Sequence, residues 1–176
     1  MIEMRTAHTA ELDDATRRAV RALMDDVFDT VSDDTFGNAL GGMHTLLFDD
    51  GKLIGHASVV QRRLLHRGQV LRTGYIEGVA VRSDQRRLGH GGAMMAVLER
   101  IVRSGYQLGA LGASPDGARL YSSRGWHLWR GPSSVLSPVG IRRTPESDGH
   151  IYVLPTSVPV DVSGELTCDW RPASVW

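Results

Sequence analysis

The sequence predicts a single α/β domain, and three observations lead to this prediction. Strand-like apolar segments alternate with segments whose apolar residues recur every three to four positions, as they do in helices. Hairpin signals connect strands in the first half of the chain. No internal repeat, low-complexity tract or long linker divides the 176 residues. A chain of this length can bury one hydrophobic core.

The first half of the chain predicts one long helix and four strands. Apolar residues at helical spacing predict a helix over 11–28. The polar segment 29–42 contains glycine, so we expect a loop there with one helical turn. Asp-Asp-Gly-Lys at 49–52 is a hairpin signal, and Arg-Gly at 67–68 marks a second turn. The strands are expected at 3–8, 43–48, 53–61 and 70–81.

The second half predicts two further helices and several short strands. A helix is expected over 89–104, with an apolar face that runs from Met94 to Val102. Pro115 suits the first turn of the next helix, and Gly125 is a typical stop after it. The strands are expected at 106–111, 126–130, 134–136, 151–155 and 165–170.

The composition narrows the class of protein. Apolar residues make up 41% and charged residues 23% of the chain, as in soluble globular domains. Basic and acidic residues number 20 each, so the net charge gives no support to nucleic-acid binding. No apolar stretch reaches the ~20 residues of a membrane span, and no signal-peptide core opens the sequence. We therefore expect a cytoplasmic protein that binds neither membranes nor nucleic acid.

Cysteine and histidine usage gives no sign of a metal site. Cys168 is the only cysteine, so no intrachain disulfide can form, in agreement with a reducing compartment. We favour a buried structural thiol over a nucleophile at this position. No Cys/His spacing resembles a zinc site, so no metal is expected. His44 and His56 fall in expected strands, where a structural role is favoured.

A glycine-rich segment at residues 86–92, Arg-Arg-Leu-Gly-His-Gly-Gly, is the strongest motif. It follows the apolar run 79–81 and opens the helix expected over 89–104. A helix N-terminus carries unpaired N–H groups and a partial positive charge, and glycines let a phosphate approach them. The Lys-Ser/Thr of a P-loop and the glycine spacing of a Rossmann fingerprint are both missing. The motif therefore predicts a phosphorylated cofactor of another class.

The Arg-x-x-Gly-x-Gly motif and the order of elements resemble the GNAT superfamily of acetyl-CoA-dependent N-acetyltransferases. Within it the chain resembles the aminoglycoside 2'-N-acetyltransferases over nearly its whole length. The resemblance implies one GNAT domain over 1–176, with a mixed central sheet that is splayed at the acetyl-CoA site, flanking helices and extra C-terminal strands. Members commonly form homodimers, and the late strands 126–136 and 150–170 are the expected interface. The segments that carry the likeness are 40–44, 75–82, 106–111, 120–126, 168–171 and 175–176.

Acetyl-CoA is the cofactor that the resemblance implies. In this superfamily the backbone of the splayed strand binds the pantetheine arm, and the N–H groups of the loop bind the pyrophosphate. The alternative for Val79 and Val81 is an ordinary core strand. The two interpretations are compatible if the backbone groups bind the cofactor while the side chains pack in the core. The implied cofactor-binding residues are Val79, Ala80, Val81, Arg86, Arg87, Leu88, Gly89, His90, Gly91 and Gly92.

Two residues take catalytic roles through the resemblance. Tyr121 matches the general acid that protonates the departing thiolate, and the alternative is an amphipathic core tyrosine. Glu77 matches the carboxylate that binds the substrate amine and accepts its proton through water, and the alternative is a solvent-facing glutamate. The implied mechanism is direct attack in a ternary complex, without an acyl-enzyme.

Aminoglycosides are polycations, so the resemblance implies a substrate site with several carboxylates. Trp176 would bring its α-carboxylate into that site, and a frayed end is the alternative. Thr35, Ser147 and Ser174 stand where acidic residues are expected. This leaves two other functions open, namely acetylation of another amine and non-catalytic binding of CoA or an aminoglycoside. The implied substrate-binding residues are Glu77, Gly78, Asp34, Asp148, Asp169 and Trp176, with Asp33 as the alternative to Asp34 and Glu146 as the alternative to Asp148.

Overall fold

The computed structural model describes residues 1–176, which form two compact units. Unit 1 contains residues 1–60 and 76–100, and unit 2 contains residues 61–75 and 101–176. Three elements run through both units, and they are β3 (Lys52–His66), β4 (Gln69–Val81) and α3 (His90–Gly105). That the chain is one functional domain remains a prediction.

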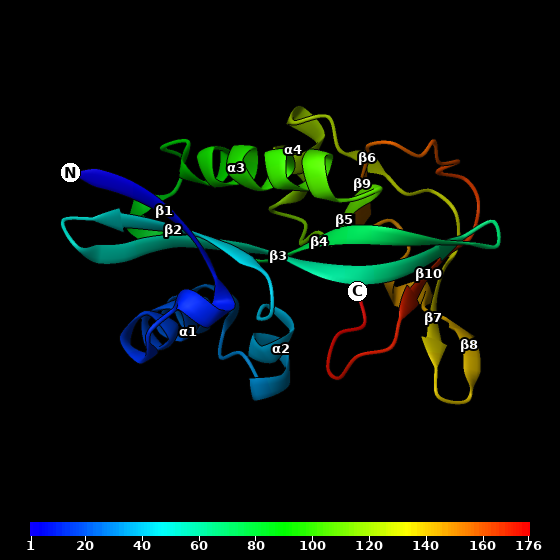
Figure 1. Ribbon diagram of the computed structural model, residues 1–176, viewed down its shortest axis with the longest axis horizontal. Coiled ribbons are helices and arrows are strands. Elements are labelled where there is room, and N and C mark those ends of the chain that lie inside the picture. Colours follow the sequence, from blue (N-terminus) through cyan, green and yellow to red (C-terminus); the bar gives the residue numbers. More distant parts are fainter. The chain divides into compact units, whose positions relative to one another are not determined.

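Unit 1 is built on an antiparallel ladder. β1 (Ile2–His8) pairs with β2 (Met43–Asp49), which pairs with β3 through the predicted hairpin. Gly55 and His56 point to opposite faces of β3, because side chains alternate along a strand. A Cβ on Gly55 would lie 3.1 Å from the Met94 sulfur of α3, so that face is covered by α3. Figure 1 shows α1 and α2 on the other face.

The two helices on that face are fixed by caps. α1 (Asp14–Phe28) begins after Asp13, whose carboxylate accepts a bond from Thr16 N at 2.7 Å. This cap is the reason why the helix expected over 11–28 begins three residues later, after a 3-10 turn over Thr9–Glu11. α2 (Asp33–Asn38) is the helical turn expected within 29–42. The core beneath these helices contains Leu12, Val20, Met24, Val31, Ala39 and Leu46.

Unit 2 contains a mixed sheet in the order β6-β9-β5-β4-β3-β10-β7-β8. β4 pairs with β5 in parallel, as does β10 with β7, whereas β9 pairs antiparallel with β5 and β6. The parallel pairing of β4 and β5 joins only residues 73–75 to 108–110, so β4 leaves this ladder after Tyr75. The remaining elements are β5 (Leu108–Gly112), α4 (Ala118–Ser123), β6 (His127–Leu128), β7 (Ser133–Ser137), β8 (Gly140–Arg143), β9 (Ile151–Pro155) and β10 (Leu166–Asp169).

Most expected elements are present, and the differences have physical causes. The sequence reading missed β8, because Gly-Ile-Arg-Arg at 140–143 has one apolar residue and is exposed throughout. The helix expected from Pro115 begins at Ala118, after a turn in which Gly117 N bonds to Ser114 O. No helix of the structure combines the length and the apolar character needed to span a membrane.

Candidate active site

The carboxyl end of β4 carries a backbone irregularity at Gly78. Its φ of 57° lies in the left-handed region, and a Cβ there would sit 3.2 Å from the His56 ring and from the Met24 sulfur. This conformation and this limited space both favour glycine. Around it Glu77, Val79 and Val81 are half-buried. Residues predicted to bind substrate and cofactor therefore flank one strained turn of unit 1.

The loop after β4 presents N–H groups at the start of α3. Arg87 and Gly89 have φ values of 63° and 86°, and the first helical bond runs from Ala93 N to Gly89 O at 3.0 Å. The N–H groups of residues 87–92 have no backbone acceptor in the structure. Such donors at a helix N-terminus attract an anion.

Two further observations fit an anionic cofactor at this loop. A Cβ on Gly89 would meet no atom within 4 Å, so the space above it is open for a phosphate. Nε2 of His90 is buried and has no hydrogen-bond partner within the protein. Arg86 is exposed beside them and donates from Nε to Val81 O at 3.2 Å. Residues 86–92 therefore suit the pyrophosphate that the sequence predicts.

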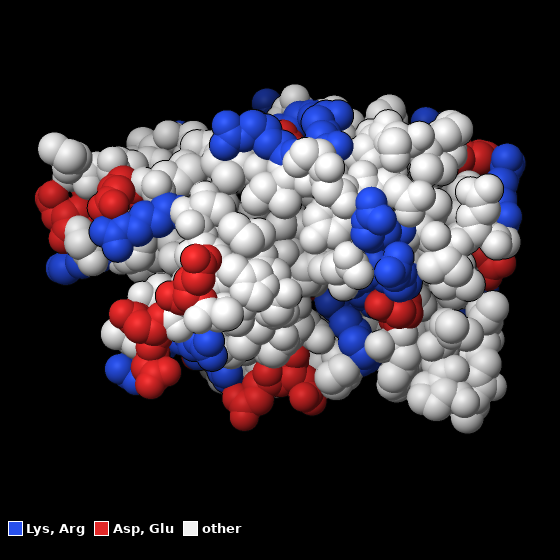
Figure 2. All heavy atoms as spheres, in the orientation of Figure 1, with Lys and Arg blue, Asp and Glu red and all other residues white.

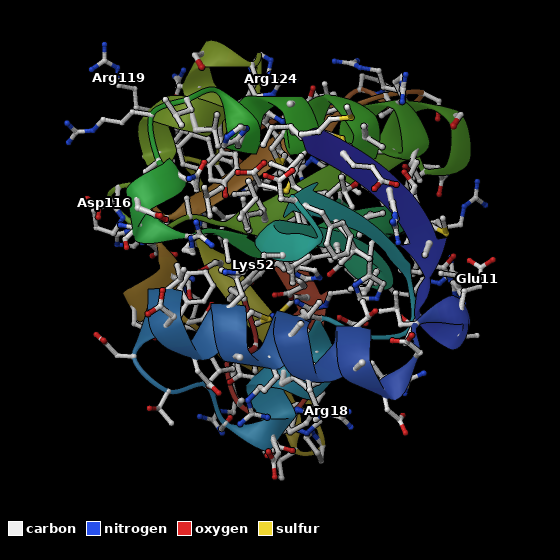
Figure 3. The ribbon with its side chains drawn as sticks, turned by 90° about the vertical axis from the view of Figure 1, so that its left-hand side faces the viewer. Glu11, Arg18, Lys52, Asp116, Arg119 and Arg124 are labelled. Carbon is white, nitrogen blue, oxygen red and sulfur yellow. The ribbon has the colours of Figure 1, made fainter.

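Tyr121 lies on α4 in unit 2. Its ring packs against Trp126 and Tyr152, with centroids 6.3 and 6.2 Å away. Burial raises the pKa of Tyr121 to about 12, so the phenol keeps its proton at neutral pH. The opposite side of α4 is polar, and Figure 3 shows the Arg119 side chain directed outward from it. Tyr121 thus has the protonation state of a proton donor.

Two of the predicted substrate carboxylates already have arginine partners. Asp169 lies 2.7 Å from the buried guanidinium of Arg62 and also accepts a bond from Arg63 N at 3.3 Å. Asp148 lies 2.7 Å from Arg143 and accepts two bonds from Ser133, at 2.7 and 2.9 Å. The bond from Arg143, followed by those from Ser133, lowers the pKa of Asp148 to about 2. Both carboxylates are therefore bonded to other residues of unit 2.

Asp34 differs from these two residues. It is exposed on α2, and no hydrogen bond or ion pair joins it to another residue. Its neighbour Asp33 forms an ion pair with Arg21 at 2.9 Å. Figure 2 shows acidic side chains gathered over α1 and α2. Among the aspartates predicted to bind substrate, Asp34 is the one whose charge is not neutralised by a neighbour.

Trp176 is held in place. It is 8% exposed, and its Nε1 donates to Thr144 Oγ1 at 2.9 Å, so the alternative of a frayed end is wrong. Ser174 donates to Trp176 O, and the buried Cys168 thiol donates to Val175 O at 3.3 Å. Burial raises the pKa of Cys168 to about 11, in agreement with a structural thiol.

A cavity of about 420 Å³ adjoins this C-terminal segment in unit 2. Ser147 and Ser174, two of the positions where acids were expected, both line it. The other lining residues are Val135, Arg142, Arg143, Thr144, Glu146, Trp170, Ala173 and Val175.

The units divide the predicted site residues between them. Unit 1 holds Asp34, residues 77–81 and residues 86–92, and unit 2 holds Tyr121, Asp148, Asp169 and Trp176. The sequence reading missed the contact between His56 and Gly78 O, at 2.8 Å. The hairpin register alone puts His44 and His56 at diagonal positions, which is a signal that could have found the pair. It also missed Arg62, whose burial follows from packing.

Comparisons with known proteins agree with this geometry. Residues 3–129 match the family described as Acetyltransferase (GNAT) domain. The chain is 48% identical over 177 aligned residues to the aminoglycoside 2'-N-acetyltransferase of Mycolicibacterium fortuitum, covering 98% of this chain and 91% of that protein.

Two solved structures from Escherichia coli share the fold. The GNAT family N-acetyltransferase YhbS, solved in complex with CoA, gives a TM-score of 0.66 at 16% identity, over 95% of this chain and 89% of that one. ElaA gives 0.62 at 22% identity, over 75% and 91%. The mixed sheet, the glycine loop at α3 and the close relative lead to one assignment. The chain belongs to the GNAT superfamily of acetyl-CoA-dependent N-acetyltransferases and, within it, to the aminoglycoside 2'-N-acetyltransferase family.

Proposed function

We propose that this protein transfers an acetyl group from acetyl-CoA to the 2'-amine of aminoglycosides, by direct attack in a ternary complex. The observation that carries the proposal is the 48% identity to an aminoglycoside 2'-N-acetyltransferase across nearly the whole chain. The unpaired N–H groups at the start of α3 support the cofactor half of the proposal. Modification of these antibiotics would confer resistance.

In this proposal residues 86–92 bind the pyrophosphate, with Arg86 at the entrance. The backbone of Val79, Ala80 and Val81 binds the pantetheine arm. When bound, acetyl-CoA supplies a thioester whose acyl carbon is open to attack by an amine. Val79 and Val81 keep their half-buried side chains in this role, since binding uses their backbone groups.

Proton transfer requires one donor and one acceptor in this mechanism. Tyr121 donates its phenol proton to the departing sulfur, and its raised pKa keeps that proton available at neutral pH. Glu77 binds the substrate ammonium and accepts its proton through water. Cys168 is buried with a raised pKa, which disfavours an acyl-enzyme on this residue.

Substrate recognition is assigned to Glu77, Gly78, Asp34, Asp148, Asp169 and Trp176. We expect Glu77 and Asp34 to contribute most to binding of the cationic substrate. Asp148 and Asp169 contribute less, because Arg143 and Arg62 already neutralise them.

This neutralisation favours a second candidate, the acetylation of an amine with fewer positive charges. Two of the predicted carboxylates carry arginine partners, and Thr35, Ser147 and Ser174 stand where acids were expected. A screen of mono-amines and peptide N-termini, with thiol release as the readout, separates this candidate from the first.

The first test is thiol release from acetyl-CoA with tobramycin and with kanamycin A. Tobramycin carries a 2'-amine, whereas kanamycin A carries a 2'-hydroxyl. We expect rapid release with tobramycin alone. If neither drug releases thiol while acetyl-CoA still binds, the aminoglycoside proposal is wrong, and either the acetylation of another amine or non-catalytic binding replaces it.

Replacement of Tyr121 by phenylalanine tests the proposed acid. Tyr121→Phe removes the hydroxyl and keeps the ring contacts, so we expect kcat to fall by about 10²–10⁴-fold. The Kd of acetyl-CoA, measured by calorimetry, should not change. Tyr152→Phe is the matched control, because this tyrosine is also buried and its ring lies 6.2 Å from Tyr121. Wild-type turnover in Tyr121→Phe would reject the assignment.

We further propose that the protein works as a homodimer in the cytoplasm. The β7–β8 hairpin exposes Leu136, Val139 and Ile141, which suits an interface between two copies. The single, reduced cysteine agrees with a cytoplasmic location. Analytical ultracentrifugation of the wild type and of Ile141→Asp tests the dimer, and a monomeric wild type would contradict it.

A further inference from the structure

Two fully buried histidines lie beneath the Gly78 turn of β4. Nδ1 of His44, on β2, is 2.9 Å from Nε2 of His56, on β3. Nδ1 of His56 is 2.8 Å from Gly78 O, and Nε2 of His44 is 2.7 Å from Thr9 Oγ1. These contacts form one continuous hydrogen-bonded chain within unit 1, from Thr9 to Gly78.

The direction of this chain follows from its last acceptor. A carbonyl oxygen can only accept, so His56 must carry its proton on Nδ1. Burial lowers the pKa of His56 to about 3, so the ring is neutral and its Nε2 is an acceptor. His44 must then donate from Nδ1 to His56 Nε2. Burial, followed by the charges of His8 and Arg17, lowers the pKa of His44 to about 4, so this ring is neutral as well.

The other end of the chain is consistent with this direction. The Thr9 hydroxyl lies 3.2 Å from Gly42 O and 2.7 Å from Nε2 of His44. Gly42 O already accepts from Thr9 N at 2.9 Å, so with its proton on Nδ1 His44 accepts at Nε2 from the Thr9 hydroxyl across the shorter contact. The Thr9 oxygen in turn accepts from the N–H groups of Gly41 and Gly42, at 2.8 and 3.2 Å. Every member therefore has a partner for its role, and one set of tautomers satisfies the chain.

This direction determines where the next backbone N–H points. Gly78 C=O and Val79 N–H belong to the same peptide unit, and no peptide bond of the chain is cis. In a trans peptide the N–H points opposite to the C=O. Because His56 holds the Gly78 carbonyl on its own side, the Val79 N–H is turned to the side away from His56.

We propose that His56, supported by His44, is a positioning residue for acetyl transfer, because it fixes the Gly78 peptide and thereby directs the Val79 N–H toward the bound cofactor. This inference rests on the proposed function, in which the Val79 backbone binds the cofactor. His56 contacts neither cofactor nor substrate in this role. It acts through the peptide that it holds.

His66 supplies a matched control on the same strand. It is buried, and its Nδ1 lies 2.9 Å from the backbone oxygen of Glu165. Its ring also packs edge-on against Trp129, with centroids 5.1 Å apart. Like His56 it is a buried histidine beside a backbone carbonyl, but it lies in unit 2 and its acceptor, Glu165, is not one of the predicted site residues.

The experiment compares His56→Leu, His56→Asn and His66→Leu. Leucine removes the hydrogen bond, whereas the asparagine amide places a donor near the position of Nδ1. We expect kcat on tobramycin to fall roughly 10–100-fold in His56→Leu, because small misplacements of reacting groups have effects of this size. His56→Asn should recover most of the loss, and His66→Leu should keep wild-type kcat. His56→Gln replaces His56→Leu if the latter does not fold.

Two NMR readouts do not require turnover. Long-range ¹⁵N correlation in the wild type should show both His44 and His56 protonated on Nδ1. Acetyl-CoA should shift the Val79 amide resonance in the wild type and in His56→Asn, but not in His56→Leu. If the wild type acetylates no aminoglycoside, the proposed function fails, and these readouts still test the inference. Three results would overturn the inference. The first is a His56 ring without a proton on Nδ1, and the second is a Val79 amide resonance that acetyl-CoA still shifts in His56→Leu. The third is an equal loss of kcat in His56→Leu and His66→Leu.

Discussion

The loop at the start of α3 and the carboxylates near the C-terminus were both predicted to bind ligand, yet they differ in their internal bonding. The N–H groups of residues 87–92 have no backbone acceptor within the protein. Asp148 and Asp169 are each bonded to an arginine and to a further donor. A group that binds an external partner in the folded state leaves its bonding capacity unused in the chain. The loop meets this criterion, and the two aspartates do not.

The comparison separates a charge that recognises substrate from a charge that stabilises the fold. Arg62 is 4% exposed and lies between Asp169, the Val175 carbonyl and the Tyr75 ring. A buried guanidinium of this kind needs a carboxylate nearby, since an unpaired buried charge is strongly destabilising. A family resemblance assigns Asp169 to substrate, whereas its contacts assign it first to Arg62.

The largest expected effect is that of Asp169→Ala on stability. Removal of the carboxylate leaves the buried Arg62 unpaired, so we expect the free energy of unfolding to fall by about 3–5 kcal/mol, measured by urea titration. Asp169→Asn keeps an acceptor for Arg62, so its free energy of unfolding should fall by less than that of Asp169→Ala.

The control for this prediction is Asp33→Ala. Asp33 also pairs with an arginine, but its side chain is 99% exposed, so the expected loss is below about 1 kcal/mol. If Asp169→Ala keeps wild-type stability and only raises the KM for tobramycin, Asp169 is a substrate carboxylate and the comparison fails.

Gly89→Ala tests the loop. We expect the Kd of acetyl-CoA to rise roughly tenfold, about 1.4 kcal/mol, because the added Cβ occupies the open space above the N–H groups. Gly51→Ala is the matched control, with φ of 77° and no atom near the added Cβ. Both variants bear the strain of a left-handed alanine, but only Gly89→Ala should weaken cofactor binding in calorimetry. Equal cofactor affinity in the two variants would contradict an anion site at Gly89.

The sequence displays the cofactor loop more clearly than the internal partners of the two aspartates, and the reason is physical. The loop is local, since its glycines and the helix that follows stand in one stretch of chain, and helix N-termini bind anions wherever they occur. The partners of the aspartates are spread more widely. Arg62 is 107 residues from Asp169, whereas Asp148 has one near partner, Arg143, five residues away, and a more distant one, Ser133, 15 residues away. Pairing across the sheet is not readable from composition.

The same distinction applies to the elements of the fold. β9 was predicted with its observed bounds, 151–155, because it is a short apolar run between polar segments. β8 was missed because all four residues of this edge strand are exposed, so its sequence lacks the alternation of apolar and polar residues that predicts a strand. The His44–His56 contact was missed because it depends on strand register, although both histidines were expected in strands. Local signals were therefore reliable, and contacts made by folding were not.

Asp148→Asn should have the smallest effect on the free energy of unfolding. The pH dependence of this effect tests whether the charge of Asp148 is its cause. Bonds from Arg143 and then Ser133 lower the pKa of Asp148 to about 2 in the folded protein, below the usual value of 3.8. The carboxylate therefore contributes stability above about pH 4, and this contribution is lost as the pH falls toward 2. The side chain is 36% exposed, so solvent screening limits the expected loss in Asp148→Asn to about 1 kcal/mol at neutral pH. Urea titrations should show the wild type and the variant converging as the pH falls through that range. A difference that stays constant with pH would show that the charge of Asp148 does not stabilise unit 2, and would favour a larger share for this residue in substrate binding.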